Sequence, residues 1–236
     1  FHCQTQSLVC GNGCSGRVQD MTVQAVVTSR VLFTGQICNS AERVYVEEGI
    51  YDEFLSKITD AMSKVTGGDP FADPAPDMGS LLSKAQLDKV SGMVERAVAA
   101  GAKVECGGQK DSTKDKGYYY LPTVLTNVQQ DSEIMQDEIF GPVLPVMKVK
   151  DLAEAIDKAN DSYYGLTSSI FTNNTNNVQR AMAELRFGET YVNRNHFEAM
   201  QGFHAGWRHS GVGGADGKWG LHEYLQSHVT YVQGQY

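Results

Sequence analysis

Cys38 is the residue whose surroundings could do covalent chemistry. It lies in the loop Thr34–Ser40, between a predicted helix and a predicted strand, with Gly35 before it and the small polar residues Asn39 and Ser40 after it. A cysteine is a good nucleophile when its thiolate is stabilised and exposed. A glycine in the loop also leaves room for backbone N–H groups to face a developing oxyanion. The residues alone leave two interpretations open, a nucleophilic thiol or a packed cysteine, and composition favours the second.

The other clusters of glycine, cysteine or histidine fit the patterns of cofactor and metal sites poorly. Gly11–Gly16 fits the G-x-G-x-x-G pattern of dinucleotide-binding folds, but only a short apolar run precedes it and no acidic residue follows about 20 positions later. Cys3, Cys10 and Cys14 lack the close paired spacing of a structural zinc site. No i, i+4 pair occurs among the late histidines, which are His204, His209 and His222. We therefore interpret these clusters as a glycine-rich loop and ordinary polar residues, and expect no metal site.

The composition limits the classes of function. The chain has 236 residues, of which 41% are hydrophobic and 20% charged, as is typical of a globular protein. A net charge of −8 argues against a broad surface for nucleic acid, and no apolar run is long enough to span a membrane. Five cysteines are an odd number in a chain too large to need disulfides, so we expect reduced thiols and a cytoplasmic location.

The elements on either side of the loop must hold Cys38 in place. Before the loop, four valines at helical spacing share one face with Arg30. After it, Ala41–Val46 alternates like a strand, and Tyr51–Val65 returns to helical spacing. The order helix, loop, strand, helix therefore places the cysteine between two regular elements.

Further along the chain, capping residues mark two more helices. Ser83 with Gln86 and Asp151 with Glu154 have the capping-box spacing, and apolar residues at helical spacing follow each pair. A further helix is predicted at 175–185, and strands are predicted at 103–106, 121–125, 143–149, 167–171 and 190–193. Strands that alternate with helices indicate an α/β fold with a largely parallel sheet and flanking helices.

Beyond Asn193 the chain loses its periodicity. Residues 203–220 are rich in glycine and aromatic side chains, and such loops more often line a site than fill a core. Ser227–Val232 is predicted to form a last strand, which stands apart from the sheet in sequence. Such a strand could pair with the sheet edge of another chain.

Five segments together resemble the motifs of the aldehyde dehydrogenase superfamily. Gly35–Cys38 resembles the G-Q-x-C segment that carries the nucleophile of that superfamily. Asp137–Val143 resembles the E-x-F-G-P segment of the superfamily. The remaining three segments are Tyr163–Thr167, Gly188–Asn193 and Ser210–Gly213, and all five occur in the order and at about the spacing found in the superfamily. Within the superfamily, Asn195–Glu198 and Gly202–Arg208 are most similar to the bacterial lactaldehyde and glycolaldehyde dehydrogenase branch.

The resemblance implies a division of the chain and an activity. Residues 1–19 are a divergent N-terminal segment, 20–221 the catalytic domain, and 222–236 a C-terminal oligomerisation segment. The implied reaction is oxidation of a small aldehyde or hydroxyaldehyde with NAD or NADP. The implied assembly is a homo-oligomer, either a dimer or a tetramer.

The resemblance also implies a role for each matched residue. Cys38 would attack the aldehyde carbon, and its own N–H would help to hold the oxyanion. Hydride transfer to the nicotinamide would then leave a thioester, which a glutamate-activated water hydrolyses. Glu138 matches the residue that contacts the nicotinamide ribose, and Phe140 matches the aromatic beside the nicotinamide. Asn39 is expected beside the substrate, Asn193 matches a residue that supports the catalytic loop, and Phe203 matches a wall of the aldehyde channel. Glu198 and His204 are expected either to recognise a substrate hydroxyl or to be ordinary polar loop residues.

One part of the family pattern does not match. Counting back from Cys38, the position of the general-base glutamate falls on Gln4–Leu8, and glutamine has no carboxylate that could take a proton from water. The family's nucleotide-binding domain, phosphate-binding lysine and oxyanion asparagine would all precede this point. Because the chain starts at Phe1 and not at Met, we expect it to be the catalytic and C-terminal portion of a longer dehydrogenase.

Three hypotheses for the function therefore stand at this stage. The chain acts within an aldehyde dehydrogenase, or it is a catalytically impaired remnant that pairs with full-length subunits through its terminal strand. The third hypothesis is a residual thiol esterase, because acyl transfer to Cys38 needs no nicotinamide.

Overall fold

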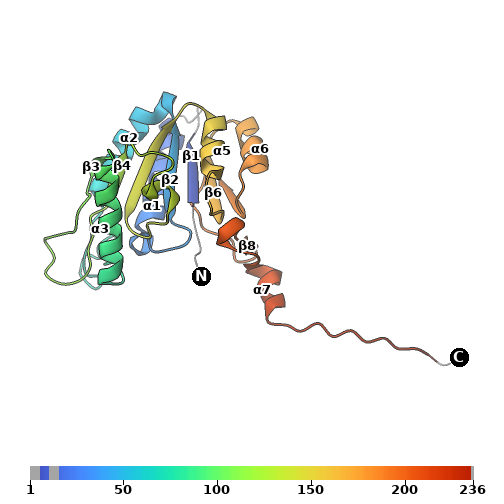
Figure 1. Ribbon diagram of the computed structural model, residues 1–236. Coiled ribbons are helices and arrows are strands. Elements are labelled where there is room, and N and C mark those ends of the chain that lie inside the picture. The colour runs from blue at the N-terminus through green and yellow to red at the C-terminus, as the bar shows by residue number, and fades with distance from the viewer. Residues whose placement is uncertain (1–5, 11–15, 235–236) are drawn as a thin grey trace.

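A seven-stranded sheet forms the centre of the computed structural model, which describes residues 6–10 and 16–234 (Figure 1). The strands lie in the order β3-β4-β5-β2-β1-β6-β7, and every neighbouring pair is parallel except β3 and β4. The strands are β1 Gln6–Cys10, β2 Ala41–Glu47, β3 Lys103–Cys106, β4 Thr123–Thr126, β5 Val143–Val149, β6 Thr167–Phe171 and β7 Glu189–Val192. The predicted α/β fold with a largely parallel sheet is confirmed.

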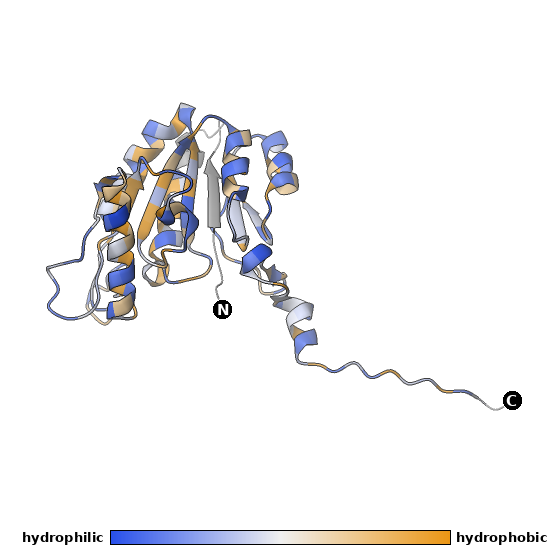
Figure 2. Ribbon diagram, in the orientation of Figure 1, coloured by the Kyte–Doolittle hydropathy of each residue, from blue (hydrophilic) through white to orange (hydrophobic). Residues whose placement is uncertain are grey.

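Helices cover both faces of this sheet. One apolar cluster joins α1 (Gly16–Val31) and α2 (Glu48–Ser63) to one face. A second cluster joins α3 (Lys84–Ala99), α4 (Glu133–Gln136), α5 (Leu152–Asn160) and α6 (Thr175–Glu184) to the other face. Figure 2 shows hydrophobic residues along the strands and hydrophilic ones on the outer turns of the helices. Two covered faces explain why β2 and β6 are buried along their whole length.

Only the N-cap half of each predicted capping box is formed. The Gln86 side chain donates instead to the carbonyls of Ile139 and Phe140, and the Glu154 carboxylate accepts from the N–H of Lys150. The Ser83 hydroxyl accepts a hydrogen bond from the backbone N–H of Gln86 at 3.2 Å, where α3 begins. The Asp151 carboxylate accepts one from the backbone N–H of Glu154 at 3.0 Å, where α5 begins. Each cap satisfies a backbone donor that has no partner inside its helix.

The C-terminal third differs from the sequence prediction in two places. The glycine-rich segment contains short elements, which are β8 (His204–Ala205), the 3₁₀ turn Arg208–Ser210, β9 (Gly214–Ala215) and α7 (Gly217–Glu223). Residues 226–234 form an exposed tail that runs away from the sheet, so the strand predicted at Ser227–Val232 does not form in the single chain (Figure 1). A strand needs a partner for its backbone N–H and C=O groups, and this tail contacts none.

The N-terminal segment reaches the middle of the sheet. β1 pairs with β2 on one side and with β6 on the other, both in parallel register. Positions 1–5 and 11–15 lie outside the described residues, and with them Cys3, Cys14 and most of the Gly11–Gly16 pattern. Among the described residues, no helix combines the length and the apolar character needed to cross a membrane.

Candidate functional site

The candidate site lies at the amino ends of three parallel strands. The nucleophile loop, residues 35–40, leads directly into β2, and residues 137–142 lead into β5, which pairs with β2. Glu189 is the first residue of β7. Because parallel strands have their amino ends on the same edge of a sheet, these segments share one edge of the molecule.

The nucleophile loop is a tight turn fixed at both ends. The backbone N–H of Ser40 donates to the carbonyl of Ile37 at 3.0 Å, which places Cys38 inside the turn. The Gln36 side chain donates to the carbonyl of Phe33 at 3.0 Å and accepts from the N–H of Leu82 at 2.9 Å. The Cys38 thiol is only partly covered, so a small molecule can reach it.

Cys38 faces a histidine that is held by a carboxylate. The His204 Nδ1 atom lies 2.7 Å from Oε1 of Glu189, and both side chains are largely buried. The hydrogen bond with the Cys38 thiol and then the contact with Glu189 raise the pKa of His204 to about 10. The imidazole is therefore protonated at neutral pH, and a cation beside a thiol stabilises the thiolate. Of this set, the sequence analysis named Cys38 and His204 and missed Glu189.

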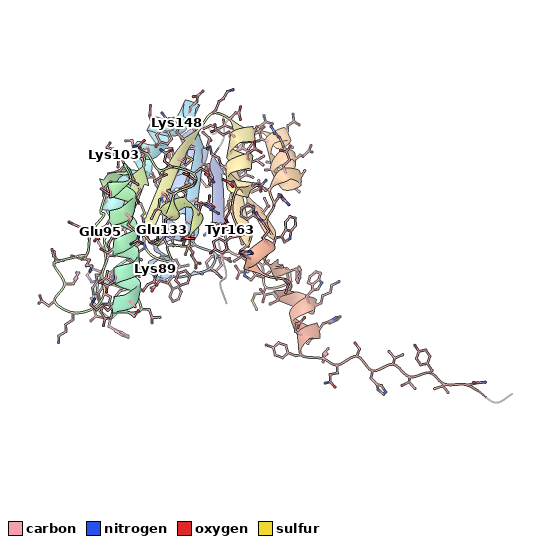
Figure 3. The ribbon with its side chains drawn as sticks, in the orientation of Figure 1. Lys89, Glu95, Lys103, Glu133, Lys148 and Tyr163 are labelled. Atoms are coloured by element: carbon pink, nitrogen blue, oxygen red, sulfur yellow. The ribbon has the colours of Figure 1, made fainter. Side chains whose placement is uncertain are left out.

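Segment 137–142 is held by side chains of α3. Lys89 Nζ donates to the carbonyl of Glu138 at 2.7 Å, and Gln86 Nε2 donates to the carbonyls of Ile139 at 3.1 Å and Phe140 at 2.8 Å. Figure 3 labels Lys89 on this part of α3. Phe140 has a positive φ of 58°, an unusual backbone conformation for a residue with a side chain. Three carbonyls held in succession give this segment a fixed shape.

The carboxyl group of Glu138 is neutral at pH 7. Burial, followed by the negative charge of Glu42, raises the pKa of Glu138 to about 8. Among the described residues, this carboxyl group has no hydrogen-bond partner. A half-buried carboxyl group with open hydrogen-bonding capacity suits a ligand that presents hydroxyl groups.

A cavity of about 490 Å³, including its opening to solvent, lies beside Cys38. Its walls are α1, the nucleophile loop and the returning segment 195–198. In the wall of the cavity, Asn39 Nδ2 donates to Oε2 of Glu198 at 2.6 Å, so two of the predicted substrate residues are bonded to each other there. The aromatic residue in this wall is Phe197, which the sequence analysis did not name.

Two predicted residues have different surroundings from those expected. The Phe203 ring packs on Trp219, with ring centroids 4.9 Å apart, and it does not line the cavity beside Cys38. The Asn193 side chain accepts from the N–H of Thr172 and donates to its carbonyl, each at 2.9 Å. Asn193 is thus bonded at the end of β6 and not to the nucleophile loop.

A buried histidine forms the floor of the site. His196 is 3% exposed, and its Nδ1 atom lies 3.4 Å from the Ser29 hydroxyl, which also accepts from the N–H of Ala41 at 3.0 Å. Burial lowers the pKa of His196 to about 3, so its imidazole is neutral in the folded chain at neutral pH. His196 therefore contributes to the fold only while it remains uncharged.

Comparisons with known proteins extend over nearly the whole chain. Residues 18–230 match the model of the aldehyde dehydrogenase family. Lactaldehyde dehydrogenase from Escherichia coli (strain K12) is 55% identical over 214 residues, which are 91% of this chain and 44% of that protein. A crystal structure of lactaldehyde dehydrogenase from Escherichia coli has a TM-score of 0.91 and 51% identity, and the match covers 98% of this chain and 47% of that one.

A second solved structure is similar at lower identity. It is a 3,6-anhydro-L-galactose dehydrogenase in complex with NAP, with a TM-score of 0.89 and 40% identity, and the match covers 94% of this chain and 46% of that one. The chain thus spans less than half the length of each of these relatives.

The buried, neutral imidazole of His196 predicts that the folded chain loses stability in acid. The pKa of His196 is about 3 in the folded chain and about 6.5 when unfolded, so between these values only the unfolded chain takes up the proton. We expect acidification from pH 7 to pH 5 to cost about 2 kcal/mol of unfolding free energy through this residue. Urea unfolding of the native chain and of His196→Gln, each at pH 7 and pH 5, measures this change in the free energy of unfolding. Equal pH dependence in the two proteins would contradict this assignment.

Proposed function

This chain belongs to the aldehyde dehydrogenase family, and we propose that it forms the catalytic portion of an enzyme that oxidises a small hydroxyaldehyde with NAD or NADP. The observation that carries the proposal is the Cys38 thiol in an accessible turn against the His204 imidazolium. We assign residues 20–221 to the catalytic domain. Because the chain spans less than half of its relatives, the complete reaction belongs to the assembled enzyme.

Cys38 is the proposed nucleophile. The positive charge of His204 stabilises the thiolate, which attacks the carbonyl carbon of the aldehyde. The carbonyl oxygen becomes an oxyanion as the carbon–sulfur bond forms. The turn closed by the hydrogen bond from Ser40 to Ile37 leaves the backbone N–H of Cys38 available to that oxyanion.

The nicotinamide end of the cofactor fits segment 137–142. A ribose presents hydroxyl groups, and the half-buried carboxyl group of Glu138 can donate to or accept from them. Phe140 supplies an aromatic side chain on the same rigid segment. When bound, the nicotinamide supplies the hydride acceptor for the reaction. Glu138 and Phe140 would hold and orient that ring beside Cys38.

The polar wall of the cavity supports a hydroxylated substrate. Asn39 and Glu198 lie beside the thiol, and His204 completes a group of hydrogen-bonding side chains around it. Such groups bind hydroxyls and leave buried polar atoms without partners when the hydroxyl is missing. Relatives named for lactaldehyde and for 3,6-anhydro-L-galactose are consistent with this class of substrate.

The missing portion of the enzyme provides the test. We expect no NADH or NADPH formation from glycolaldehyde or lactaldehyde by the chain alone. Co-expression with the N-terminal portion of the Escherichia coli relative should restore it, because Cys38 then meets a bound nicotinamide. The absorbance of the reduced nicotinamide measures turnover, and Cys38→Ser in the same pair is the control. Turnover that survives this substitution would refute the assignment of the nucleophile.

A second candidate function, a thiol esterase, is favoured by the Cys38–His204–Glu189 arrangement. A thiol, an imidazole and an orienting carboxylate in series are sufficient for acyl transfer without a nicotinamide. The thiolate would attack an ester carbonyl, the alcohol would leave, and water would hydrolyse the thioester to release the acid and regenerate the thiol. His204 is placed to move the protons between these groups.

Hydrolysis of 4-nitrophenyl acetate by the chain alone tests this second function. We expect Cys38→Ser to reduce the release of 4-nitrophenolate to the uncatalysed rate, and His204→Gln to reduce it about a hundredfold. Cys106→Ser is the matched control, because that half-buried thiol lies on β3, far along the sheet from the site. Equal rates in the native chain and in Cys38→Ser would exclude an esterase that uses this thiol.

The exposed tail supports the proposal that the chain pairs with other subunits. Residues 226–234 make no regular structure in the single chain, and Val229, Tyr231 and Val232 are strongly exposed. An extended segment of this kind can add to the edge of another sheet through its backbone groups. We assign residues 222–236 to this contact, between copies of the chain or with full-length subunits.

Removal of the tail tests the pairing. The complete chain should sediment as an oligomer, and a chain that ends at residue 225 should sediment as a monomer. Thr230→Pro is a milder variant that removes one backbone donor from the tail, and we expect it to weaken association without changing the fold. The same sedimentation coefficient for all three proteins would argue against pairing through the tail.

A further inference from the structure

Arg30 contacts both ends of the nucleophile loop. This arginine of α1 is fully buried, and its Nη2 atom donates to the carbonyl of Gly35 at 2.6 Å. Its Nη1 atom donates to the carbonyl of Ala41 at 2.6 Å, on the far side of Cys38. The residue before the turn and the residue after it are thus held by one planar, rigid group.

Glu42 extends this contact to the segment of Glu138. Its Oε1 atom lies 2.8 Å from Nη1 of Arg30, and the two side chains are 4% and 0% exposed. Its Oε2 atom accepts from the backbone N–H of Ile139 at 3.1 Å. One carboxylate therefore bonds to the arginine that holds the loop and to the backbone between Glu138 and Phe140.

The loop and the segment also touch through their backbones. Gly35 has a φ of +72°, and a Cβ atom there would lie 2.4 Å from the carbonyl oxygen of Gly141 and 2.5 Å from Nη2 of Arg30. Only glycine fits such an approach. The arrangement leaves no space for the loop to move toward segment 137–142.

The energetics of a buried ion pair favour a geometric role over a stabilising one. The cost of removing both charges from water offsets most of their attraction, so an apolar pair of similar size would stabilise the fold as well. An apolar pair could not direct hydrogen bonds to Gly35, Ala41 and Ile139. These directed bonds are what the charged pair adds at this position.

We propose that Arg30 and Glu42 are positioning residues, which hold the Cys38 thiol against His204 and at a fixed place relative to Glu138 and Phe140. This inference rests on the proposed function, since it assigns to the pair the alignment of nucleophile and cofactor segment. Arg30 acts through the backbone of the loop and does not itself touch the reacting atoms. Its loss should therefore change the reactivity of Cys38 before it changes the rest of the fold.

The rate of alkylation of Cys38 by iodoacetamide, followed by peptide mass spectrometry, tests the role of Arg30. In the native chain the loop presents the partly covered thiol of Cys38 beside His204. We expect Arg30→Met to lower the alkylation rate of Cys38 relative to that of Cys106 at least tenfold, because the loop is then no longer held at Gly35 and Ala41. Arg30→Lys keeps the charge but loses the planar group that reaches both carbonyls, so it should lower this relative rate as well, which separates positioning from charge. Cys106 is the internal reference, and its own alkylation rate should not change.

A second measurement covers the case in which Arg30→Met does not fold. Glu42→Gln keeps the size of the side chain but cannot accept at both atoms, so hydrogen exchange in peptide 137–142 should rise at least tenfold. Exchange in β6, residues 167–171, should be unchanged. Native reactivity of Cys38 in a folded Arg30→Met, or native exchange in Glu42→Gln, would overturn the proposal. Neither measurement needs an aldehyde or a nicotinamide, so either can fail independently of the proposed function.

Discussion

Coverage of both faces of the parallel sheet is the constraint on which the site depends. The middle strands are buried along their length, so side chains that do chemistry can stand only at strand ends or in loops. Cys38 precedes β2 and Glu138 precedes its neighbour β5, whereas Glu189 begins β7, which lies three strands from β2. His204 comes from a later loop and spans this interval, with Glu189 on one side and Cys38 on the other.

The same edge of the sheet holds two titratable groups in protonation states that are unusual at neutral pH, and a third whose neutral state is fixed by burial. Contact with a thiol and a carboxylate keeps His204 positively charged. Burial keeps His196 neutral, and burial beside Glu42 keeps Glu138 neutral. The charge of these neighbours of Cys38 is thus decided by which partner each ring or carboxyl group faces, because burial alone would make every one of them neutral.

Most of the fold could be predicted from the sequence, and the site only in part. Capping spacing and hydrophobic period are local signals, so the helices and strands between α1 and β7 were found, except for the one-turn helix α4. The central strand β1 was not predicted, because it is a short run in a segment without a family motif. Glu189 was missed because its pairing with His204 joins residues that share no local pattern. Arg30 was counted with the valines of one helical face, and that face is buried, but its side chain donates to the carbonyls at both ends of a loop. The tail was predicted as a strand because its composition suits one, yet a strand also needs a neighbour.

The position of β1 has a consequence for how such a sheet can change over evolutionary time. The family match begins at residue 18, whereas β1, at Gln6–Cys10, lies before it and still occupies the middle of the sheet. Pairing with β2 and β6 uses backbone N–H and C=O groups, which every residue except proline supplies in full. A central strand can therefore change much of its sequence and keep its place, provided that its side chains still fit between the helices on both faces. The strand order can in this way persist where the sequence pattern of a family does not.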